Sequence, residues 1–189
     1  MMDRREALKR VGAVMGATLS LPLISGVLAG CGGGASDMTA FVPKTLSADQ
    51  NELVSTLAEL IIPTTDTPGA RAAGVNEFID LMITDWYGAE DRTRFLEGLA
   101  AADERARTAH KVAFVDATVE QQTAILTGFE QEALAGSSAD KPFFSLLKEM
   151  TITGYYTSEI GASQELKYLH SAGYYNGDVP YAEVGRAYS

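Results

Sequence analysis

Apolar positions recur at three- and four-residue intervals through most of the chain after residue 46, which is the period of helices packed on a core. The first such segment opens with Ser47 and Gln50 in the spacing of a capping box and ends at Pro63. The apolar positions of the four later segments are Val75, Phe78, Ile79, Met82 and Trp86; Phe95, Leu96, Leu99 and Ala102; Ile125, Phe129 and Leu134; and Phe143, Phe144, Leu147 and Met150. No window alternates with the period of a strand. We therefore expect an all-α fold, a compact bundle of about five helices.

Glycine, proline and capping residues place the ends of these segments. Gly88 ends the second predicted helix, and Thr118 with Gln121 forms a second capping box ahead of the fourth. Pro142 opens the fifth helix, where its missing N–H costs nothing, and we expect that helix to run to about Ser158.

The C-terminal part of the chain has a different composition. Seven of the eight tyrosines lie within the final 35 residues, accompanied by glycine and proline. We expect a short helix followed by an irregular, tyrosine-rich C-terminal tail. Tyrosine is favoured at protein interfaces, but it also covers helix cores, and both interpretations stay open. The tyrosines considered for a partner interface are Tyr155, Tyr156, Tyr174, Tyr175 and Tyr181.

The N-terminal 30 residues have the order of an export signal: basic residues, a mildly apolar stretch, then small residues. The pair Arg4-Arg5 resembles the twin-arginine export signal, although Ala7 stands where a large apolar residue is usual. The alternative is a transmembrane anchor. Pro22 and three glycines in the apolar stretch weaken that alternative.

The sequence Leu28-Ala29-Gly30-Cys31 resembles the lipobox of bacterial lipoproteins, in which the cysteine sulfur carries diacylglycerol. Cys31 is the chain's only cysteine, and the glycines after it match no core pattern, which disfavours a buried structural thiol. The predicted organisation is an export signal over 1–30, a lipidated flexible tether over 31–46 and a helical domain over 47–189. We expect an exported protein on the periplasmic side, attached to a membrane through Cys31.

Charge and motif content exclude several function classes. The net charge of −10 argues against nucleic acid as a partner, and two histidines leave little for a metal or haem site. No nucleophile elbow, Walker loop or dinucleotide fingerprint occurs. The sequence predicts no catalytic, cofactor-binding or metal-binding residue. Asp66, in a threonine-rich loop, is either a contact for a partner or a turn residue whose side chain satisfies nearby backbone groups.

Two separated strings carry a family resemblance. Residues 60–70 read LIIPTTDTPGA and are followed by Ala73-Gly74-Val75, and residues 154–161 read GYYTSEIG. Together with Gly173-Tyr174, these strings resemble the gluconate 2-dehydrogenase subunit 3 family, over most of residues 47–182.

The resemblance implies a small accessory (gamma) subunit of a large FAD-dependent dehydrogenase of the glucose-methanol-choline class, which oxidises a sugar, a sugar acid or a polyol. It implies FAD in that partner, no cofactor in this chain, and haem c where a cytochrome c subunit completes the complex. It also implies that the large subunit, lacking a signal of its own, is exported together with the small one.

Two alternatives stay open. One is a stand-alone periplasmic lipoprotein that binds a small ligand through its tyrosine-rich region. The other is a periplasmic hydrolase using Asp66 or Glu159, for which the sequence supplies no complete catalytic set.

Overall fold

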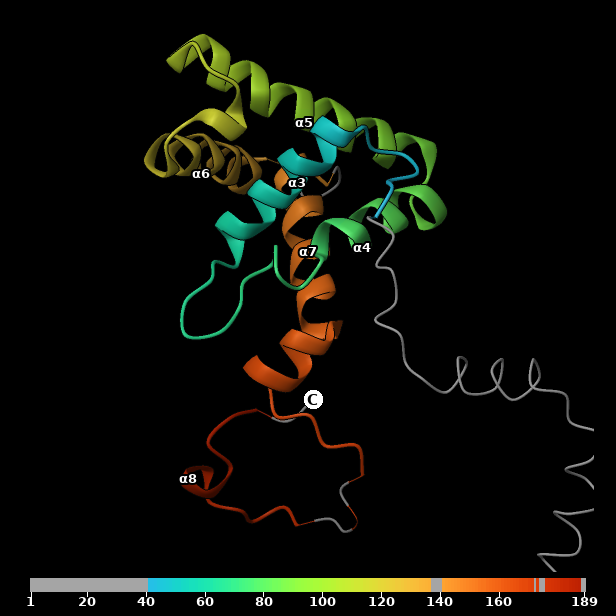
Figure 1. Ribbon diagram of the computed structural model, residues 1–189, viewed down its shortest axis with the longest axis vertical. Coiled ribbons are helices and arrows are strands. Elements are labelled where there is room, and N and C mark those ends of the chain that lie inside the picture. Colours follow the sequence, from blue (N-terminus) through green and yellow to red (C-terminus); the bar gives the residue numbers. More distant parts are fainter. Residues whose placement is uncertain (1–40, 137–140, 172, 174–175, 188–189) are drawn as a thin grey trace, which may run out of the picture. The chain divides into compact units, whose positions relative to one another are not determined.

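The computed structural model of the chain describes residues 41–136, 141–171, 173 and 176–187. Its helices, in chain order, are α3 (Ala48–Ile61), α4 (Val75–Leu81), the π-helical turn η1 (Met82–Trp86), α5 (Ala89–His110), the 3₁₀ turn η2 (Phe114–Asp116), α6 (Val119–Ala135), α7 (Phe143–Thr157), the π-helical turn η3 (Gly161–Glu165) and α8 (Tyr181–Val184) (Figure 1). No β-strand occurs in these ranges, so the predicted all-α fold is confirmed. None of these helices combines the length and the apolar character needed to cross a bilayer.

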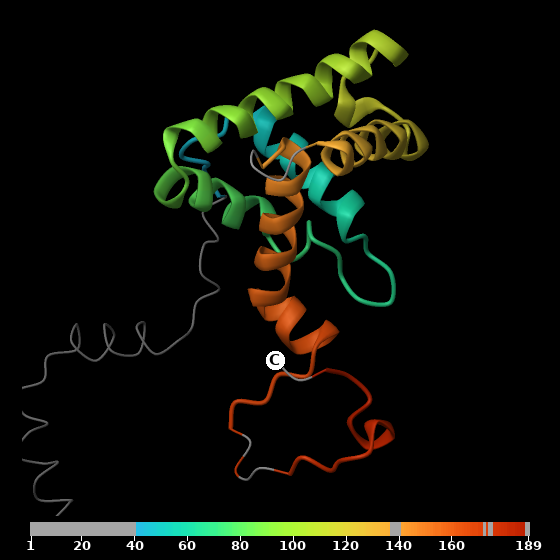
Figure 2. The same cartoon turned by 180° about the vertical axis from the view of Figure 1, so that it is seen from behind.

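Helix α7 is the centre of the bundle. It contacts α3, α4, α5 and α6, and eight of its residues are buried (Figures 1 and 2). Its apolar side chains therefore form the common core on which the other helices pack.

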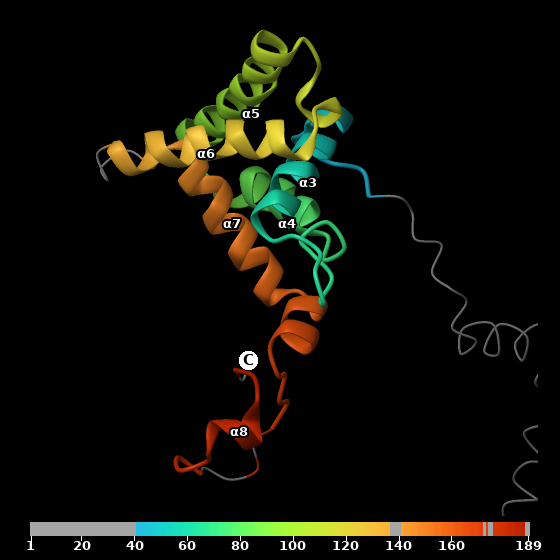
Figure 3. The same cartoon turned by 90° about the vertical axis from the view of Figure 1, so that its left-hand side faces the viewer.

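The close crossing of α5 and α7 depends on a glycine. The Phe143 side chain lies directly against the backbone of Gly98, where a Cβ would overlap the ring. The same ring packs on Phe95, at 5.5 Å between centroids, and edge-on against Phe129 of α6, at 5.3 Å. Phe143 thus joins α5, α6 and α7 at the start of α7. Figure 3 shows α7 running downward from α6.

The predicted capping boxes are both present. The Ser47 hydroxyl accepts from the N–H of Gln50 while the Gln50 side chain accepts from the N–H of Ser47, and Thr118 and Gln121 pair in the same way. The helix starts were readable from sequence because a capping box satisfies two otherwise unpaired N–H groups locally.

Trp86 does not face the core, so its predicted inward position was wrong. Its exposed fraction is 78%, whereas Tyr87 packs against the core. The reason is the π-helical turn, in which the N–H of Tyr87 donates to the carbonyl of Met82, five residues back. One extra residue in the turn shifts the register by one position.

Arg92 fixes this turn from the following helix. Its Nε donates to the carbonyl of Ile83 over 2.6 Å, and its Nη2 donates to the carbonyl of Thr84 over 2.8 Å. The guanidinium thus donates hydrogen bonds to carbonyls at the end of the helix, where the helix itself supplies no further N–H donors.

The buried carboxylate of Asp80 holds the segment that leads into the domain. It accepts hydrogen bonds from the backbone N–H groups of Lys44, Thr45 and Leu46 over 2.7, 3.0 and 2.9 Å. Leu46 is itself buried. The domain therefore begins earlier than the predicted Ser47, and residues 44–46 belong to it rather than to a tether.

The predictions on the N-terminal region, including Arg4, Arg5 and Cys31, lie outside the described residues. The chain divides into two units between Phe41 and Val42, and all of the described helices belong to the unit that begins at Val42.

Candidate partner interface

The loop between α3 and α4 is held in one conformation by Glu59. One carboxylate oxygen of Glu59 accepts from the N–H and the hydroxyl of Thr64, over 2.8 and 2.7 Å, and the other accepts from the N–H of Arg71 over 2.9 Å. The loop is closed at its base, where the N–H of Ala70 donates to the carbonyl of Ile62. A single side chain thus connects the two ends of the loop.

These hydrogen bonds change the acidity of Glu59. Partial burial alone would raise its pKa, but the hydrogen bonds from Arg71 and Thr64 outweigh burial and lower the pKa below its ordinary value of 4.5. Gly69 is required beside this carboxylate, because a Cβ there would come within 2.5 Å of both Glu59 and the Thr64 nitrogen.

Tyr155 joins the two sequence strings that carry the family resemblance. Its hydroxyl donates to the carbonyl of Pro68, in the α3–α4 loop, over 2.8 Å. Thr67 of the same loop donates to the Glu165 carboxylate over 2.9 Å. Residues about 90 positions apart therefore meet, and the loop rests on the C-terminal end of α7 and on η3.

Two glycines allow this junction to close. A Cβ at Gly154 would come within 2.7 Å of the Phe78 ring, and one at Gly161 would overlap the carbonyl of Tyr155. The conformation of the GYYTSEIG string thus needs its first and last residues to lack side chains.

The predicted interface residues divide into three groups. Tyr155 is 1% exposed, so it supports the loop from below and offers no surface to a partner. Asp66 is exposed at the loop tip, where it accepts from the Thr65 hydroxyl over 3.0 Å. Tyr156 and Tyr181 are exposed, on α7 and α8 respectively.

Tyr174 and Tyr175 lie outside the described residues. The structure therefore brings the Asp66 loop together with Tyr155, while Tyr181 belongs to a separate short helix.

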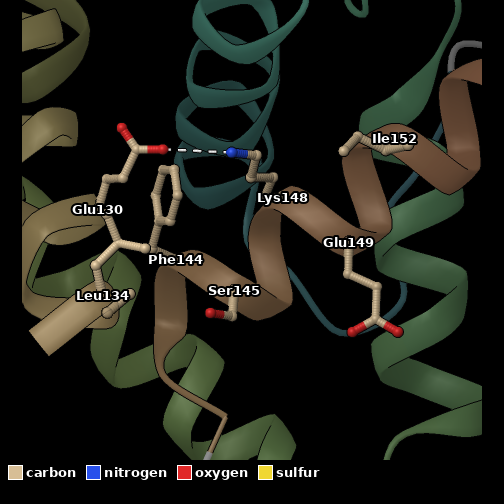
Figure 4. Close-up of a pocket in the computed structure, with 8 residues that line it drawn as sticks. Glu130, Leu134, Phe144, Ser145, Lys148, Glu149 and Ile152 are labelled. Carbon is tan, nitrogen blue, oxygen red and sulfur yellow. Dashed lines mark hydrogen bonds and ion pairs between the residues drawn. The ribbon is translucent and has the colours of Figure 1, made fainter. Parts of the chain in front are cut away.

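A second feature is an apolar groove of about 340 Å³ between α6 and α7 (Figure 4). Its lining residues are Glu130, Ala133, Leu134, Phe144, Ser145, Lys148, Glu149 and Ile152. Leu134 is 80% exposed and Ile152 is 41% exposed, so two large aliphatic side chains border the groove and face solvent.

Lys148 lies over the groove, between Glu130 and the Phe144 ring. Its ammonium is 3.3 Å from the Glu130 carboxylate and 5.4 Å from the centre of the Phe144 ring (Figure 4). The groove thus has an apolar floor with one ion pair across it, the pattern of an interface centre surrounded by polar groups.

The groove continues toward α3. An adjoining hollow of about 230 Å³ shares Glu130, Phe144 and Lys148 with it and reaches Leu60 and Ile61 at the end of α3. Because Ile61 directly precedes the α3–α4 loop, the hollow ends next to that loop. We call the groove and the hollow together the α6–α7 face.

Sequence reasoning placed Leu134 among the inward positions of α6, and that prediction was wrong. The signal against it was present: Leu134 follows Ile125 by nine residues, which is a rotation of about 180° around a helix. Ile152 was not considered at all, although it shares a side of α7 with Phe144 and Lys148 at four-residue spacing.

Among the described residues, no three His, Cys, Asp or Glu side chains cluster in a way that could hold a metal ion. The arrangement that is present suits protein recognition: a rigid loop beside an exposed apolar groove.

Comparison with known protein families gives one match. The family model described as gluconate 2-dehydrogenase subunit 3 covers residues 48–173, which include α3 to α7, the α3–α4 loop and the whole α6–α7 face. Neither the search of curated proteins nor that of solved structures found a match. The family match spans well over half of the chain and contains both strings that meet at Tyr155, so this chain belongs to the gluconate 2-dehydrogenase subunit 3 family.

Proposed function

We propose that the chain is a non-catalytic accessory subunit of an exported, FAD-dependent dehydrogenase of the glucose-methanol-choline class. The observation that carries the proposal is the family match over residues 48–173. The family is described as a subunit of gluconate 2-dehydrogenase, and a subunit implies partner chains. The large partner would hold FAD and the sugar, sugar acid or polyol substrate, and a cytochrome c subunit would carry haem c where it is present.

The α6–α7 face is the surface that we assign to the large partner. A monomer that exposes Leu134 and Ile152 beside an open apolar groove gains by covering them, because each buried apolar Å² contributes about 25 cal/mol. Aliphatic side chains of the partner would fill the groove, and the Lys148–Glu130 pair would set their register.

The α3–α4 loop adds a contact that needs no ordering on binding. Glu59, Tyr155 and Glu165 already fix it, so the complex avoids the entropy of immobilising a flexible segment. Asp66 at its tip is then available to a donor on the partner.

The export role rests on the twin-arginine resemblance of Arg4-Arg5. A flavoprotein that binds FAD in the cytoplasm and lacks its own signal would cross the membrane folded, bound to this subunit. Lipidation of Cys31 would then hold the complex on the periplasmic side of a membrane, since each buried methylene of the acyl chains contributes about 0.8 kcal/mol.

Co-export of the partner tests this function. The double substitution Arg4→Lys and Arg5→Lys is made in the full chain, and FAD-containing dehydrogenase is assayed in periplasm and cytoplasm. The expected result is retention of both proteins in the cytoplasm. Export of the dehydrogenase despite retention of this chain would contradict the proposal.

A further inference from the structure

The side chain of Trp86 faces solvent, and the backbone that carries it is held in place by neighbouring residues. It is the chain's only tryptophan and is 78% exposed. The π-helical turn that carries it is fixed by the two hydrogen bonds from Arg92 to the carbonyls of Ile83 and Thr84. The exposed Trp86 side chain is therefore carried by a hydrogen-bonded helical turn and not by an irregular loop.

Trp86 also lies where the chain enters the domain. Lys44, in the lead-in segment, pairs with Asp85 at 3.9 Å, and the hydroxyls of Thr45 and Thr84 lie 2.6 Å apart. Figure 1 shows this lead-in segment, in blue, beside the green end of α4. The segment is thus pinned against the same turn that presents Trp86.

Other apolar side chains are exposed at this corner. Val42, at the start of the lead-in segment, is 78% exposed, and Leu81 is 46% exposed. Leu81 precedes Trp86 by five residues. In a turn closed by hydrogen bonds between residues five apart, two such positions lie on the same side.

The length of chain before this corner limits its distance from a lipid anchor. Phe41 follows Cys31 by ten positions, and an extended chain of that length spans at most about 35 Å. With Cys31 acylated, as the proposed function requires, no other part of the domain is connected as directly to the bilayer as the corner formed by Val42, Lys44 and Trp86.

We infer that this corner rests on the lipid surface, with the Trp86 indole in the headgroup region of the bilayer. The inference rests on the proposed lipidation of Cys31. An indole combines an apolar ring with one N–H donor, which suits the boundary between headgroups and acyl chains. The face assigned to the dehydrogenase would then be oriented relative to the membrane by a second contact, in addition to the acyl chains.

Nearby charges specify the kind of lipid. Asp85, Glu90 and Asp91 all lie within five residues of Trp86, and Glu90 is 91% exposed. Lys44 pairs with Asp85, Arg94 pairs with Glu90 and Asp91, and Arg92 lies on the same turn, so the three acids are balanced by three cations. A corner without excess charge fits zwitterionic headgroups, while the net charge of −10 on the whole chain opposes binding to anionic headgroups.

Fluorescence of the single tryptophan tests the inference directly. The full lipidated protein is purified from membranes of its native host and reconstituted into phosphatidylcholine vesicles whose acyl chains are brominated. Vesicle flotation is measured on the same sample. We expect flotation, a blue-shifted Trp86 emission, quenching by the brominated lipid, and a smaller shift when phosphatidylglycerol is added.

A relocated tryptophan gives the matched control. In the double variant W86F/L134W the reporter moves to the end of α6, where Leu134 is 80% exposed, close to the value for Trp86. Lipid quenching of the native protein should exceed that of this variant by at least about twofold, because only Trp86 would sit at headgroup depth. Equal quenching of the two would overturn the inference.

The other possible results distinguish the membrane contact of Trp86 from the lipidation of Cys31, on which the inference rests. Flotation with Trp86 still fully quenched by aqueous iodide would overturn the membrane contact and leave the anchor intact. Failure to float would overturn lipidation and the inference together. Shielding of Trp86 in the isolated dehydrogenase complex, without lipid and without brominated-lipid quenching, would assign the residue to the partner and also overturn the inference.

Discussion

The hydroxyl of Tyr155 donates a hydrogen bond to the carbonyl of Pro68 over 2.8 Å. This contact ties the C-terminal end of the central helix to the α3–α4 loop, which contains most of the LIIPTTDTPGA string. The loop, the groove beside it and the helix below them therefore form one structural unit.

Replacing Tyr155 by Phe removes this hydrogen bond and keeps the buried ring. We expect a loss of about 1 kcal/mol in the free energy of unfolding, since the Pro68 carbonyl is left without its protein donor. Urea denaturation measures the loss. Tyr156→Phe is the control, because that ring is 39% exposed, and it should change stability by less than about 0.5 kcal/mol. Equal losses in the two variants would contradict the assignment.

Glu59 makes the loop sensitive to acid. Its pKa is lower in the folded protein than the ordinary value of 4.5, so its stabilising effect is complete above pH 4.5 and is lost as the pH falls through the folded-state pKa. Glu59→Gln should lower stability at pH 7 by about 1 kcal/mol and should make the difference from the native protein shrink below pH 4.5. Urea denaturation from pH 7 to pH 3 measures it. A difference that does not vary with pH would contradict this role.

Alanine substitution should lower the stability of the protein at Gly98 and raise it at Gly128. A Cβ at Gly98 would overlap the Phe143 ring, so Gly98→Ala should destabilise the protein by about 1–3 kcal/mol. At Gly128 the nearest atom would be Arg105 Nη1 at an ordinary 3.7 Å, and a helix-interior alanine gains up to about 1 kcal/mol. Thermal unfolding of both variants measures this. A destabilised Gly128→Ala with a neutral Gly98→Ala would contradict the packing described at α5 and α7.

The groove between α6 and α7 should control binding of the large subunit. The double variant L134E/I152E places two carboxylates on the exposed aliphatic positions, so we expect at least about tenfold weaker binding, a loss of roughly 1.4 kcal/mol. The control is Val119→Glu, at a 63% exposed position of α6 outside the groove. Circular dichroism confirms that both remain folded. If the control weakens binding as much as the double variant, the partner does not use the groove.

The sequence predicted best what is decided locally. Both capping boxes and the extent of α7 depend on residues within one or two helical turns, and the structure confirms them. The all-α class followed from the same short-range periodicity.

Features that depend on tertiary contacts could not be predicted. The inward prediction for Trp86 failed because the π-helical turn shifts the register, and that turn is stabilised by Arg92 from the next helix. The burial of Tyr155 and the role of Asp80 depend on partners 87 and about 35 residues away. The groove needed α6 and α7 to be placed side by side, although the phase of Leu134 on its helix was already a signal.

We propose above that this chain is a subunit of a flavin dehydrogenase. The most direct measurement is purification of the tagged full chain from its native host under mild detergent, with an absorbance spectrum, mass spectrometry and the stoichiometry of the purified particle. We expect a flavin spectrum and a large flavoprotein in equimolar amount, both lost when the L134E/I152E variant is purified. A colourless chain that purifies alone, with the dehydrogenase intact elsewhere in the same cells, would contradict it.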